Sequence, residues 1–362
     1  MVRRAYSPVR IGDVADLAGV STATVSRVLN GSAVVADAKR LKVLAMIGEL
    51  GYRPNRVARN LRRQQTQMIG LVISDIENPH FTQMVRAAED AAYRRGYRVL
   101  LCNTDENPTK ERDYLGALAA ERVAGVIISP TEADAPEISE LLDNGTCVVA
   151  FDRAVADPRA DAVLSANIEG ASQGTKHLLA CGHTNIGFVG GPTGIETAAQ
   201  RLRGYDQAMS KAGLKTRVAQ GNFRVEGGRR AAEELIVQGA TALLVANNMM
   251  TIGVLQAIRE NGQRLALDVA LVSIDDPPWA EITEPALTTL AQPVRAMVDA
   301  AVRLLLQRLE GGRTRRRHEV FDMEFRHRQS CCYPGRAETR YQREKTGPAS
   351  ASTTGHRRGH RT

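Results

Sequence analysis

The sequence contains no uninterrupted apolar run of about 18 residues, the length that a membrane-spanning helix requires. Its first residues, MVRRAYSPVRIGDV, include the basic residues of a secretory signal but no apolar segment behind them. We therefore expect no membrane partner and a cytoplasmic location. The 362 residues, 43% of them hydrophobic, are too many for one small core and predict two or three folded units.

Cysteines are few, and their number is odd. The five are Cys102, Cys147, Cys181, Cys331 and Cys332, and only the last two are close in sequence. This scatter predicts ordinary cytosolic thiols rather than a disulfide framework or a zinc site. The adjacent pair receives no role from the sequence.

Motifs of cofactor and metal enzymes are also missing. No G-x-G-x-x-G follows an apolar run, no G-x-x-x-x-G-K-[ST] occurs, and no metal-ligand spacing is present. We therefore expect no cofactor, no metal and no catalytic site. An enzyme on a doubly wound fold stays open as an alternative, since Asp275-Asp276 could imitate a carboxylate pair, although Pro277 and Pro278 follow rather than a base. Turnover of the ligand would distinguish an enzyme from a sensor.

The charge that is present is distributed unevenly. Residues 1–65 hold 12 Lys and Arg against 4 Asp and Glu, and residues 313–362 hold 13 against 5. The segment between them holds 23 basic and 31 acidic residues. A basic head before an acidic body indicates a polyanionic partner at the head, although a solvated surface could also produce this asymmetry.

Residues 9–53 predict three short helices with a tight turn between the first two, which is the helix-turn-helix pattern. Gly19 ends the first helix, and Ser21 is a good N-cap for the second. A third helix is expected from about Asp37 to Leu50, with Leu41, Leu44 and Leu50 facing inward.

From Gln67 onward, short apolar runs alternate with helical stretches, a pattern typical of parallel sheets covered on both faces. Strands are expected at 68–74, 97–103, 123–129, 147–152, 186–190, 242–247 and 269–275. Helices are expected at 80–95, 109–120, 167–181, 195–212 and 226–238, and a helix and turn at 251–264. Because these units are too many for one open sheet, we predict an α/β core of two lobes.

The segments IGDVADLAGVSTATVSRVLNG (11–31) and LGYRPNRVARNLRR (50–63) resemble the head of the lactose/galactose repressor family of bacterial transcriptional regulators. The resemblance extends to about Cys332. It implies a helix-turn-helix domain at 9–53, a hinge helix at 54–65 and a periplasmic-binding-protein-like core at 66–332. The implied lobes are roughly 66–165 plus 291–320, and 166–290 plus 321–332. The basic residues 333–362 are expected to be a disordered tail.

The same resemblance implies how the head binds double-stranded operator DNA. Thr22, Ala23 and Arg27 would read bases, while Ser21, Thr24, Ser26 and Asn30 would bond phosphates. In the hinge, Leu61 would wedge into the minor groove, with Asn55, Ala58 and Arg59 nearby. Ser21 as a mere N-cap, and Leu61 as a core residue, stay open. A single head buries too little surface for tight binding, so a homodimer on a near-palindromic site is expected.

The core of this family binds a small effector between its lobes, at the carboxyl ends of strands. The candidate effector-binding residues are Asp75, His80, Asp152, Arg153, Arg201, Phe223, Asn247 and Asp275. Carboxylates, an amide, an arginine fork and an aromatic ring suit a sugar or sugar derivative. Asp75 and Asp152 as helix caps, and Phe223 as core, are alternatives. Asn248 and Ala166 stand where the family usually has Asp.

We therefore predict a transcriptional repressor whose DNA affinity is controlled by a sugar-like effector. Either sign of response, release or promotion of DNA binding, is compatible with the fold. The runner-up is a soluble sugar-binding or transport protein. The head at 11–31 and the missing secretory signal argue against it.

Overall fold

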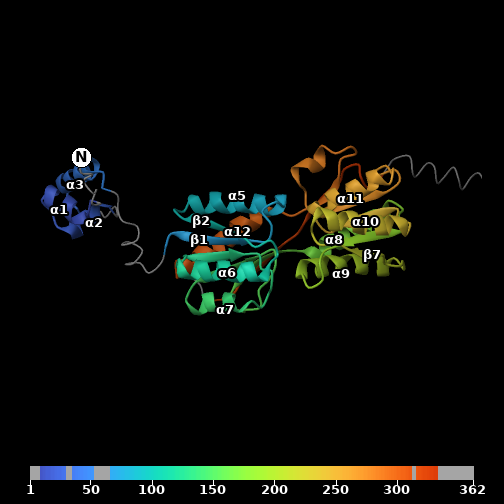
Figure 1. Cartoon of the computed structure of the whole chain (residues 1–362), viewed down its shortest axis with the longest axis horizontal. Coiled ribbons are helices and arrows are strands. Elements are labelled where there is room, and N and C mark those ends of the chain that lie inside the picture. The colour runs from blue at the N-terminus through green and yellow to red at the C-terminus, as the bar shows by residue number, and fades with distance from the viewer. Residues whose placement is uncertain (1–8, 30–34, 53–65, 312–314, 333–362) are drawn as a thin grey trace, which may run out of the picture. The chain divides into compact units, whose positions relative to one another are not determined.

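The computed structural model describes residues 9–29, 35–52, 66–311 and 315–332 (Figure 1). By its internal contacts the chain divides into two units, Met1–Thr66 and Gln67–Thr362, which we describe separately. Among the described residues, no helix is both long and apolar enough to cross a membrane.

The described residues of the N-terminal unit form three helices, α1 (Ile11–Ala18), α2 (Thr22–Leu29) and α3 (Asp37–Leu50). Val14, Val25 and Val43 form the centre of a small core between them. Both α1 and α3 end at glycines, Gly19 and Gly51, whose φ angles of 63° and 60° lie in the left-handed region that other residues rarely adopt. The predicted helices are thus present at the expected places.

The inward face of α3 differs from the prediction. Val43 is fully buried, whereas Leu41 and Leu44 are 68% and 50% exposed. The inner face runs from Val43 through Ile47 to Leu50, steps of four and three residues that stay on one side of a helix. Leu41 lies two residues before Val43, which turns it about 200° away from the core. The prediction for Leu41 and Leu44 was wrong because leucine type alone does not define a helix face.

The first lobe of the core is a six-stranded, fully parallel sheet in the order β11-β5-β4-β3-β1-β2. Its strands are β1 (Met68–Ile73), β2 (Arg98–Asn103), β3 (Gly125–Ile128), β4 (Cys147–Phe151), β5 (Asp161–Ser165) and β11 (His318–Phe321). Helices α5 (Pro79–Tyr93) and α12 (Val294–Leu309) cover one face, and α6 (Pro108–Ala120) and α7 (Pro136–Asp143) cover the other. Apolar strands buried on both faces explain the continuous hydrophobic runs in the sequence.

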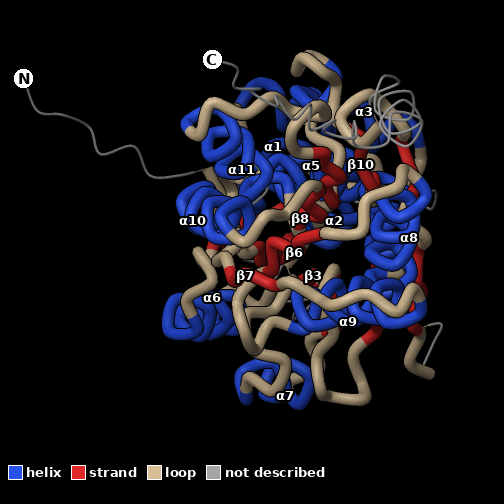
Figure 2. The backbone as a smooth tube through the Cα atoms, turned by 90° about the vertical axis from the view of Figure 1, so that its right-hand side faces the viewer, coloured by secondary structure: helices blue, strands red, loops and turns tan. Residues whose placement is uncertain are grey.

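The second lobe has the sheet order β12-β10-β9-β8-β6-β7, in which only β12 is antiparallel. Its strands are β6 (Ile186–Gly190), β7 (Val218–Gln220), β8 (Ala242–Val245), β9 (Ala270–Ile274), β10 (Thr288–Ala291) and β12 (Glu324–Arg326). Its helices are α8 (Asn167–Ala180), α9 (Glu196–Lys211), α10 (Val225–Val237), α11 (Asn248–Glu260) and the 3-10 helix η1 (Pro278–Glu281). Figure 2 shows α10 and α11 on one side of β6 and β8, and α8 and α9 on the other.

Two glycines let helix pairs of the second lobe approach closely. A Cβ on Gly204 of α9 would lie 2.2 Å from the Ile168 carbonyl oxygen at the start of α8. A Cβ on Gly253 of α11 would lie 1.9 Å from the Val225 carbonyl oxygen at the start of α10. Since both clashes are with backbone, only glycine permits these packing distances.

The predicted α/β class with parallel sheets is confirmed, and each strand and helix predicted within the described residues has a counterpart. The predicted hinge helix at 54–65 lies outside the described residues. The prediction missed strands β5, β7, β10, β11 and β12 and helices α7 and α12. Most of the missed strands are three or four residues long, and β11 (HEVF) and β12 (EFR) are polar edge strands. Short edge strands carry little apolar pattern, because only part of their surface is buried.

The cysteine prediction was wrong in one respect. The structure joins Cys181 and Cys332 by a disulfide, while Cys102, Cys147 and Cys331 are free thiols. The two partners are 151 residues apart in the chain, so no sequence spacing marks them.

Candidate functional site

The outer face of α2 carries the side chains that we predicted to read bases. Thr22, Ala23 and Arg27 are exposed, whereas Val25 and Val28 of the same helix are buried against α1 and α3. Because buried and exposed residues alternate with the helical period, the apolar face fixes the helix and leaves the polar face available to a partner. This arrangement fits a helix that enters the major groove of DNA.

The structure brings Ser21 and Thr24 together at the start of α2. The Thr24 amide donates to Ser21 Oγ at 3.2 Å, and the two hydroxyl oxygens are 3.0 Å apart. Ser21 is therefore an N-cap, as the alternative interpretation had it, and its exposed position also leaves it accessible. Ser26 is half-buried on the same helix. Asn30, Asn55, Ala58, Arg59 and Leu61 lie outside the described residues.

In the core, all eight predicted effector-binding residues line one cavity of about 440 Å³, part of it open to solvent. Six further residues line it as well: Asn78, Phe81, Glu106, Thr197, Arg224 and Gln292. The lining comes from both lobes and lies where strands end, for example Asp152 after β4 and Asp275 after β9. Carboxyl ends of parallel strands meet at one edge of a sheet, so strand order gathers the strand-end residues of each lobe, while helices α5 and α9 add His80, Phe81, Thr197 and Arg201.

Strained backbone is concentrated at this cavity. Among the described residues, seven other than glycine have positive φ angles, and four of these line the cavity: Glu106 (57°), Asp152 (65°), Phe223 (61°) and Asp275 (72°). Such conformations are uncommon outside glycine and persist where the surroundings enforce them, often at ligand sites.

Arg153 is buried in the first-lobe wall of the cavity and forms a forked ion pair. Its Nη1 and Nη2 atoms donate to the two carboxylate oxygens of Glu106 at 2.7 and 2.5 Å, and Nη1 also donates to the Pro130 carbonyl at 3.2 Å. Burial lowers the pKa of Arg153, but the Glu106 carboxylate more than offsets this effect, so the pKa is raised. The guanidinium therefore stays charged and fixed in orientation.

Arg201 of α9 and Asn247 belong to the second-lobe wall. Arg201 is 4% exposed, and it donates from Nε to Asn167 Oδ1 and from Nη1 to the Ala246 carbonyl, both at 2.7 Å. The Asn247 side chain accepts from the Met250 amide at 2.9 Å, which caps α11, and donates to the Phe223 carbonyl at 3.2 Å. Asn247 thus holds the backbone of Phe223 as well as lining the cavity.

Three polar contacts link the two lobes across the cleft. Arg224 Nη1 donates to Asp75 Oδ2 at 2.7 Å, and Asn248 Nδ2 donates to Asn78 Oδ1 at 3.0 Å. His80 Nδ1 also lies 3.8 Å from Asp275 Oδ1. The structure is therefore a closed arrangement of the lobes. Asn248 uses its side-chain amide as a donor in this closure.

Burial raises the pKa of the Asp75 carboxyl above its ordinary value. The Glu77 amide and the Arg224 guanidinium lower it, but they do not compensate fully. The pKa of Asp75 therefore depends on whether Arg224 forms its ion pair with this carboxylate.

Several buried polar atoms at the cavity have no hydrogen-bond partner within the described protein. These include His80 Nε2, Asp152 Oδ1 and Arg153 Nε. Since unpaired buried polar groups cost free energy, a bound molecule that supplies donors and acceptors would satisfy these three atoms.

Sequence reasoning missed Glu106, Arg224 and Gln292 for identifiable reasons. Gln292 follows β10, a strand that the apolar pattern did not predict. Glu106 follows β2 by three residues, in the polar turn TDEN, and pairs with Arg153 over 47 positions. The position of Glu106 just after the predicted strand 97–103 could have indicated that it lines the cleft. Nothing in the sequence indicates a pair between the lobes such as Arg224 and Asp75.

Comparison with known proteins agrees with this geometry. A family profile described as bacterial regulatory proteins of the lacI family matches residues 10–55, and one described as a periplasmic binding protein-like domain matches residues 175–331. The HTH-type transcriptional repressor PurR of Photobacterium profundum is 33% identical over 323 residues, which cover 86% of this chain and 95% of that protein. PurR of Mannheimia succiniciproducens is 34% identical over 306 residues, 83% of this chain and 91% of that protein.

Solved structures show the same likeness. A lac repressor dimer bound to operator and the anti-inducer ONPF is 28% identical, has a TM-score of 0.81 and covers 90% of this chain and all of that one. The transcriptional regulator CelR with cellobiose is 31% identical, has a TM-score of 0.68 and covers 89% and 99%. The chain is thus a helix-turn-helix regulatory protein with a periplasmic-binding-protein-like core. It belongs to the lacI family of bacterial regulatory proteins.

Proposed function

We propose that the protein is a transcriptional repressor that binds a near-palindromic operator as a homodimer, with its DNA affinity set by an uncharged sugar or sugar derivative in the cleft. The observation that carries this proposal is the cavity between the two lobes, which eight predicted residues line and where three buried polar atoms lack hydrogen-bond partners among the described residues. The curated relatives are named as transcriptional repressors, which supports a sensor rather than an enzyme. Since its partner is chromosomal DNA, we place the protein in the cytoplasm.

The DNA side of the proposal depends on α2. Arg27 is exposed one turn beyond Ala23 and can form the bidentate contact with guanine that arginine favours. Ser21, Thr24 and Ser26 lie beside it and would bond phosphates. Operator affinity should fall steeply with salt, because the unit of residues 1–65 carries 12 Lys and Arg. The solved lac repressor dimer is bound to operator, which supports the same role here.

The ligand chemistry follows from the charges in the cavity. Four carboxylates, Asp75, Glu106, Asp152 and Asp275, face three arginines and one histidine. Each arginine already donates to a protein oxygen: Arg153 to Glu106, Arg201 to Asn167, and Arg224 to Asp75. Since the four carboxylates outnumber the three arginines, an uncharged molecule with several hydroxyls fits better than an anion. CelR, a similar structure, is solved with cellobiose.

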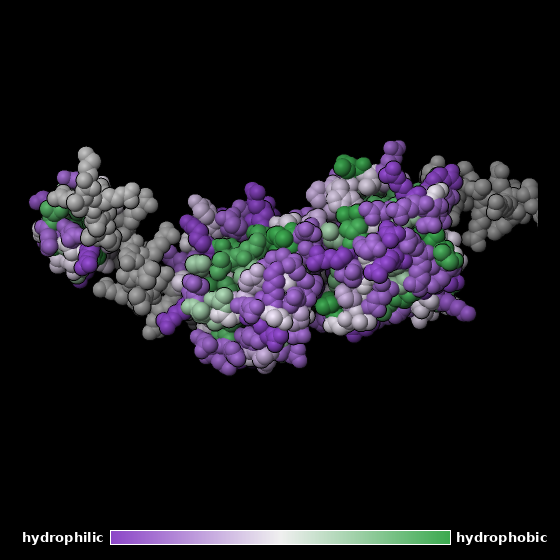
Figure 3. All heavy atoms as spheres, in the orientation of Figure 1, coloured by the Kyte–Doolittle hydropathy of each residue, from purple (hydrophilic) through white to green (hydrophobic). Residues whose placement is uncertain are grey.

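The first lobe offers a surface for the dimer. Strand β2 is an edge of its sheet, with Leu101 39% exposed and Val99 and Leu100 half-buried, and Tyr93 of α5 is 60% exposed beside it. Figure 3 shows apolar side chains gathered on the visible face of this lobe. An edge strand with apolar side chains is a ready site for a second chain.

The coupling would act through lobe closure. A ligand that contacts both walls favours the arrangement in which Asp75 meets Arg224 and Asn78 meets Asn248. It shifts the equilibrium by its differential affinity for the two arrangements, and the dimer transmits that shift to the two heads.

The decisive experiment is a pull-down of fragmented genomic DNA by the purified protein at physiological salt, sequenced and repeated with a panel of sugars. We expect a short near-palindrome whose recovery changes with one sugar, and the direction of change shows whether that sugar releases or promotes binding. Arg27→Ala should lose the motif, and Arg201→Met should keep the motif but lose the sugar response. The absence of any enriched motif would contradict the repressor, and a motif indifferent to every sugar would contradict the proposed effector class.

A further inference from the structure

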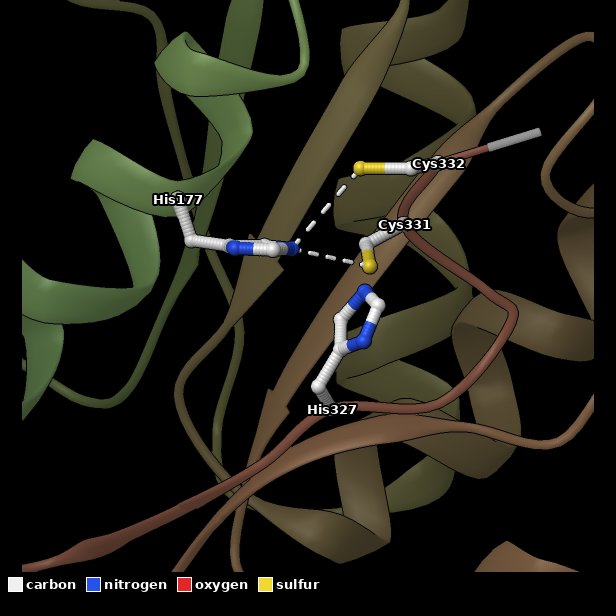
Figure 4. A group of neighbouring side chains, drawn as sticks. All are labelled: His177, His327, Cys331 and Cys332. Carbon is white, nitrogen blue, oxygen red and sulfur yellow. Dashed lines mark hydrogen bonds between the residues drawn. The ribbon is translucent and has the colours of Figure 1, made fainter. Parts of the chain in front are cut away.

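A second cluster of reactive side chains lies in the second lobe, and the function proposed above makes no use of it. His177 is in the last turn of α8, while His327, Cys331 and Cys332 follow β12. Helix α8 contacts β9, β10 and β12, so the fold brings these segments together. Figure 4 shows the Cys331 and Cys332 sulfurs facing the same ring nitrogen of His177, with the His327 ring close to Cys331.

The ligand atoms of these four residues are spaced like those of a metal site. His177 Nε2 lies 3.0 Å from Cys331 Sγ and 3.8 Å from Cys332 Sγ, and all four ligand atoms lie within 4.8 Å of one another. A tetrahedral zinc ion with bonds of about 2.0 to 2.3 Å places its ligand atoms about 3.3 to 3.8 Å apart. Small rotations of the side chains are therefore enough to close the site around an ion.

The immediate surroundings also suit a bound cation. Thr288 Oγ1 accepts from the Arg328 amide at 3.0 Å, which leaves the hydroxyl hydrogen free to donate to Cys331 Sγ, 3.0 Å away. A donor to the sulfur stabilises the thiolate, as outer-shell partners of metal ligands do. The Phe325 ring lies 4.7 Å from that of His177 and shields one side, whereas the exposed His327 leaves a path for the ion.

We propose that His177, His327, Cys331 and Cys332 form a zinc site. Two imidazoles and two thiolates are the ligand set of structural zinc sites, and hard cations such as Mg²⁺ and Ca²⁺ require oxygen ligands that this cluster lacks. Binding of Zn²⁺ displaces one proton from each of the two thiols, so the two thiolate charges neutralise the ion and two protons are released. The sequence did not indicate the site because 150 residues separate His177 from His327.

The disulfide between Cys181 and Cys332 competes with this site for one ligand. Reduction by a phosphine or dithiol delivers two electrons, and with two protons it yields the two thiols and the oxidised reductant. Cys332 then becomes available as a ligand. The Cys181 sulfur, at the end of α8, also lies 3.5 Å from His177 Nε2, but Cys181 is not one of the four residues whose ligand atoms all lie within 4.8 Å of one another. The bound ion would fasten residues 327–332 to α8 within the second lobe.

The test uses the full-length protein, freed of metal with a chelator and reduced with a phosphine. Cobalt(II) is added as a spectroscopic probe, and Zn²⁺ affinity is measured by competition with a chromophoric chelator. We expect one ion per chain, with the absorption of tetrahedral cobalt and a thiolate-to-cobalt charge-transfer band. Excess Zn²⁺ should remove both signals. This readout does not involve DNA or sugar, so it succeeds or fails independently of the function proposed above.

Three variants assign the ligands. Cys331→Ser and His177→Gln should each weaken Zn²⁺ binding at least about 100-fold, since loss of an outer-shell partner alone costs about 10- to 100-fold. Cys181→Ser should bind as tightly as the parent and without prior reduction, because Cys332 then has no disulfide partner. Cys147→Ser in the first lobe is the matched control and should change nothing. Circular dichroism and thermal melting verify that each variant is folded.

The proposal is overturned if the reduced protein shows no thiolate-to-cobalt band. It is also overturned if a folded Cys331→Ser protein binds Zn²⁺ as the parent does, or if Cys181→Ser abolishes binding.

Discussion

The two arginines to which we assign functional roles, Arg27 in the N-terminal unit and Arg201 in the cleft of the core, lie in opposite environments. Arg27 is exposed on a helix whose other face forms the core, so the fold makes no demand on its side chain. Arg201 is 4% exposed and holds Asn167 and the Ala246 carbonyl. The proposed DNA-reading face thus consists of side chains that the fold does not depend on, whereas the proposed effector-binding residues of the cleft also hydrogen-bond to the surrounding structure.

This difference has consequences for substitutions. Substitution of an exposed residue away from special features usually changes the free energy of unfolding by less than about 0.5 kcal/mol, so we expect the outer face of α2 to tolerate substitutions that would alter operator preference. Buried polar networks are coupled, and removing one member leaves its partners unsatisfied. A change of effector in the core should therefore require compensating substitutions.

The largest expected effect in this comparison is that of Arg201→Met. Removing the guanidinium leaves Asn167 Oδ1 and the Ala246 carbonyl without their donor, and a hydrogen bond to a charged group contributes about 1.5–3 kcal/mol. We expect the free energy of unfolding to fall by about 3 kcal/mol, measured by urea denaturation, and the sugar response to be lost.

The matched control for Arg201→Met is Arg203→Met, an exposed position on the same helix. It should leave both stability and the sugar response near those of the parent. Equal stability of the two variants would show that Arg201 is not part of a structural network. It would contradict the difference that we infer between the cleft and the exposed face of α2.

The intermediate effect is that of Arg27→Ala on DNA binding. Loss of a bidentate base contact should cost about 1–3 kcal/mol of operator affinity and relax specificity at one base position, with the melting temperature unchanged. Lys42→Ala, an exposed basic residue of α3, removes the same charge and should weaken binding to operator and random DNA alike. Competition binding against mutated operators measures both. An Arg27→Ala protein that discriminates bases as the parent does would refute the base-reading role.

The sequence was more informative about strand ends than about partners. Residues such as Asp152 and Asp275 directly follow buried apolar runs, so a polar side chain at a strand end could be predicted to line the cleft. The pairing of Arg153 with Glu106, and of Arg224 with Asp75, depends on how distant segments meet. The local sequence pattern predicts whether a segment is a helix or a strand and where it ends. It does not predict the tertiary contacts that decide which charged side chains pair with each other.

The same limit applies to the cysteines and to α3. Cys181 and Cys332 meet only because α8 contacts the last strand of the second sheet. Leu41 and Leu44 are apolar residues on the exposed side of α3, where residue type and burial disagree. Apolar character predicted a helix there, but not its inward face.

The smallest expected effect is that of Arg224→Gln. This arginine lies in the cleft, but its side chain is 34% exposed, so it tests whether a partly exposed cleft residue also contributes to stability. Its bridge to Asp75 should contribute less than about 1 kcal/mol to stability, as partly exposed ion pairs do.

Arg224 lowers the pKa of Asp75, so the variant should raise that pKa further. A folded-state pKa above the unfolded value favours the fold at acidic pH, and this contribution is lost as pH rises through the folded pKa. The variant should therefore match the parent below the pKa of Asp75 and become less stable than the parent above it. Carboxyl NMR titration and urea denaturation at acidic and neutral pH measure the two quantities, with Arg230→Gln on α10 as the control. A stability difference that is the same at both pH values would show that Asp75 and Arg224 are not coupled across the cleft.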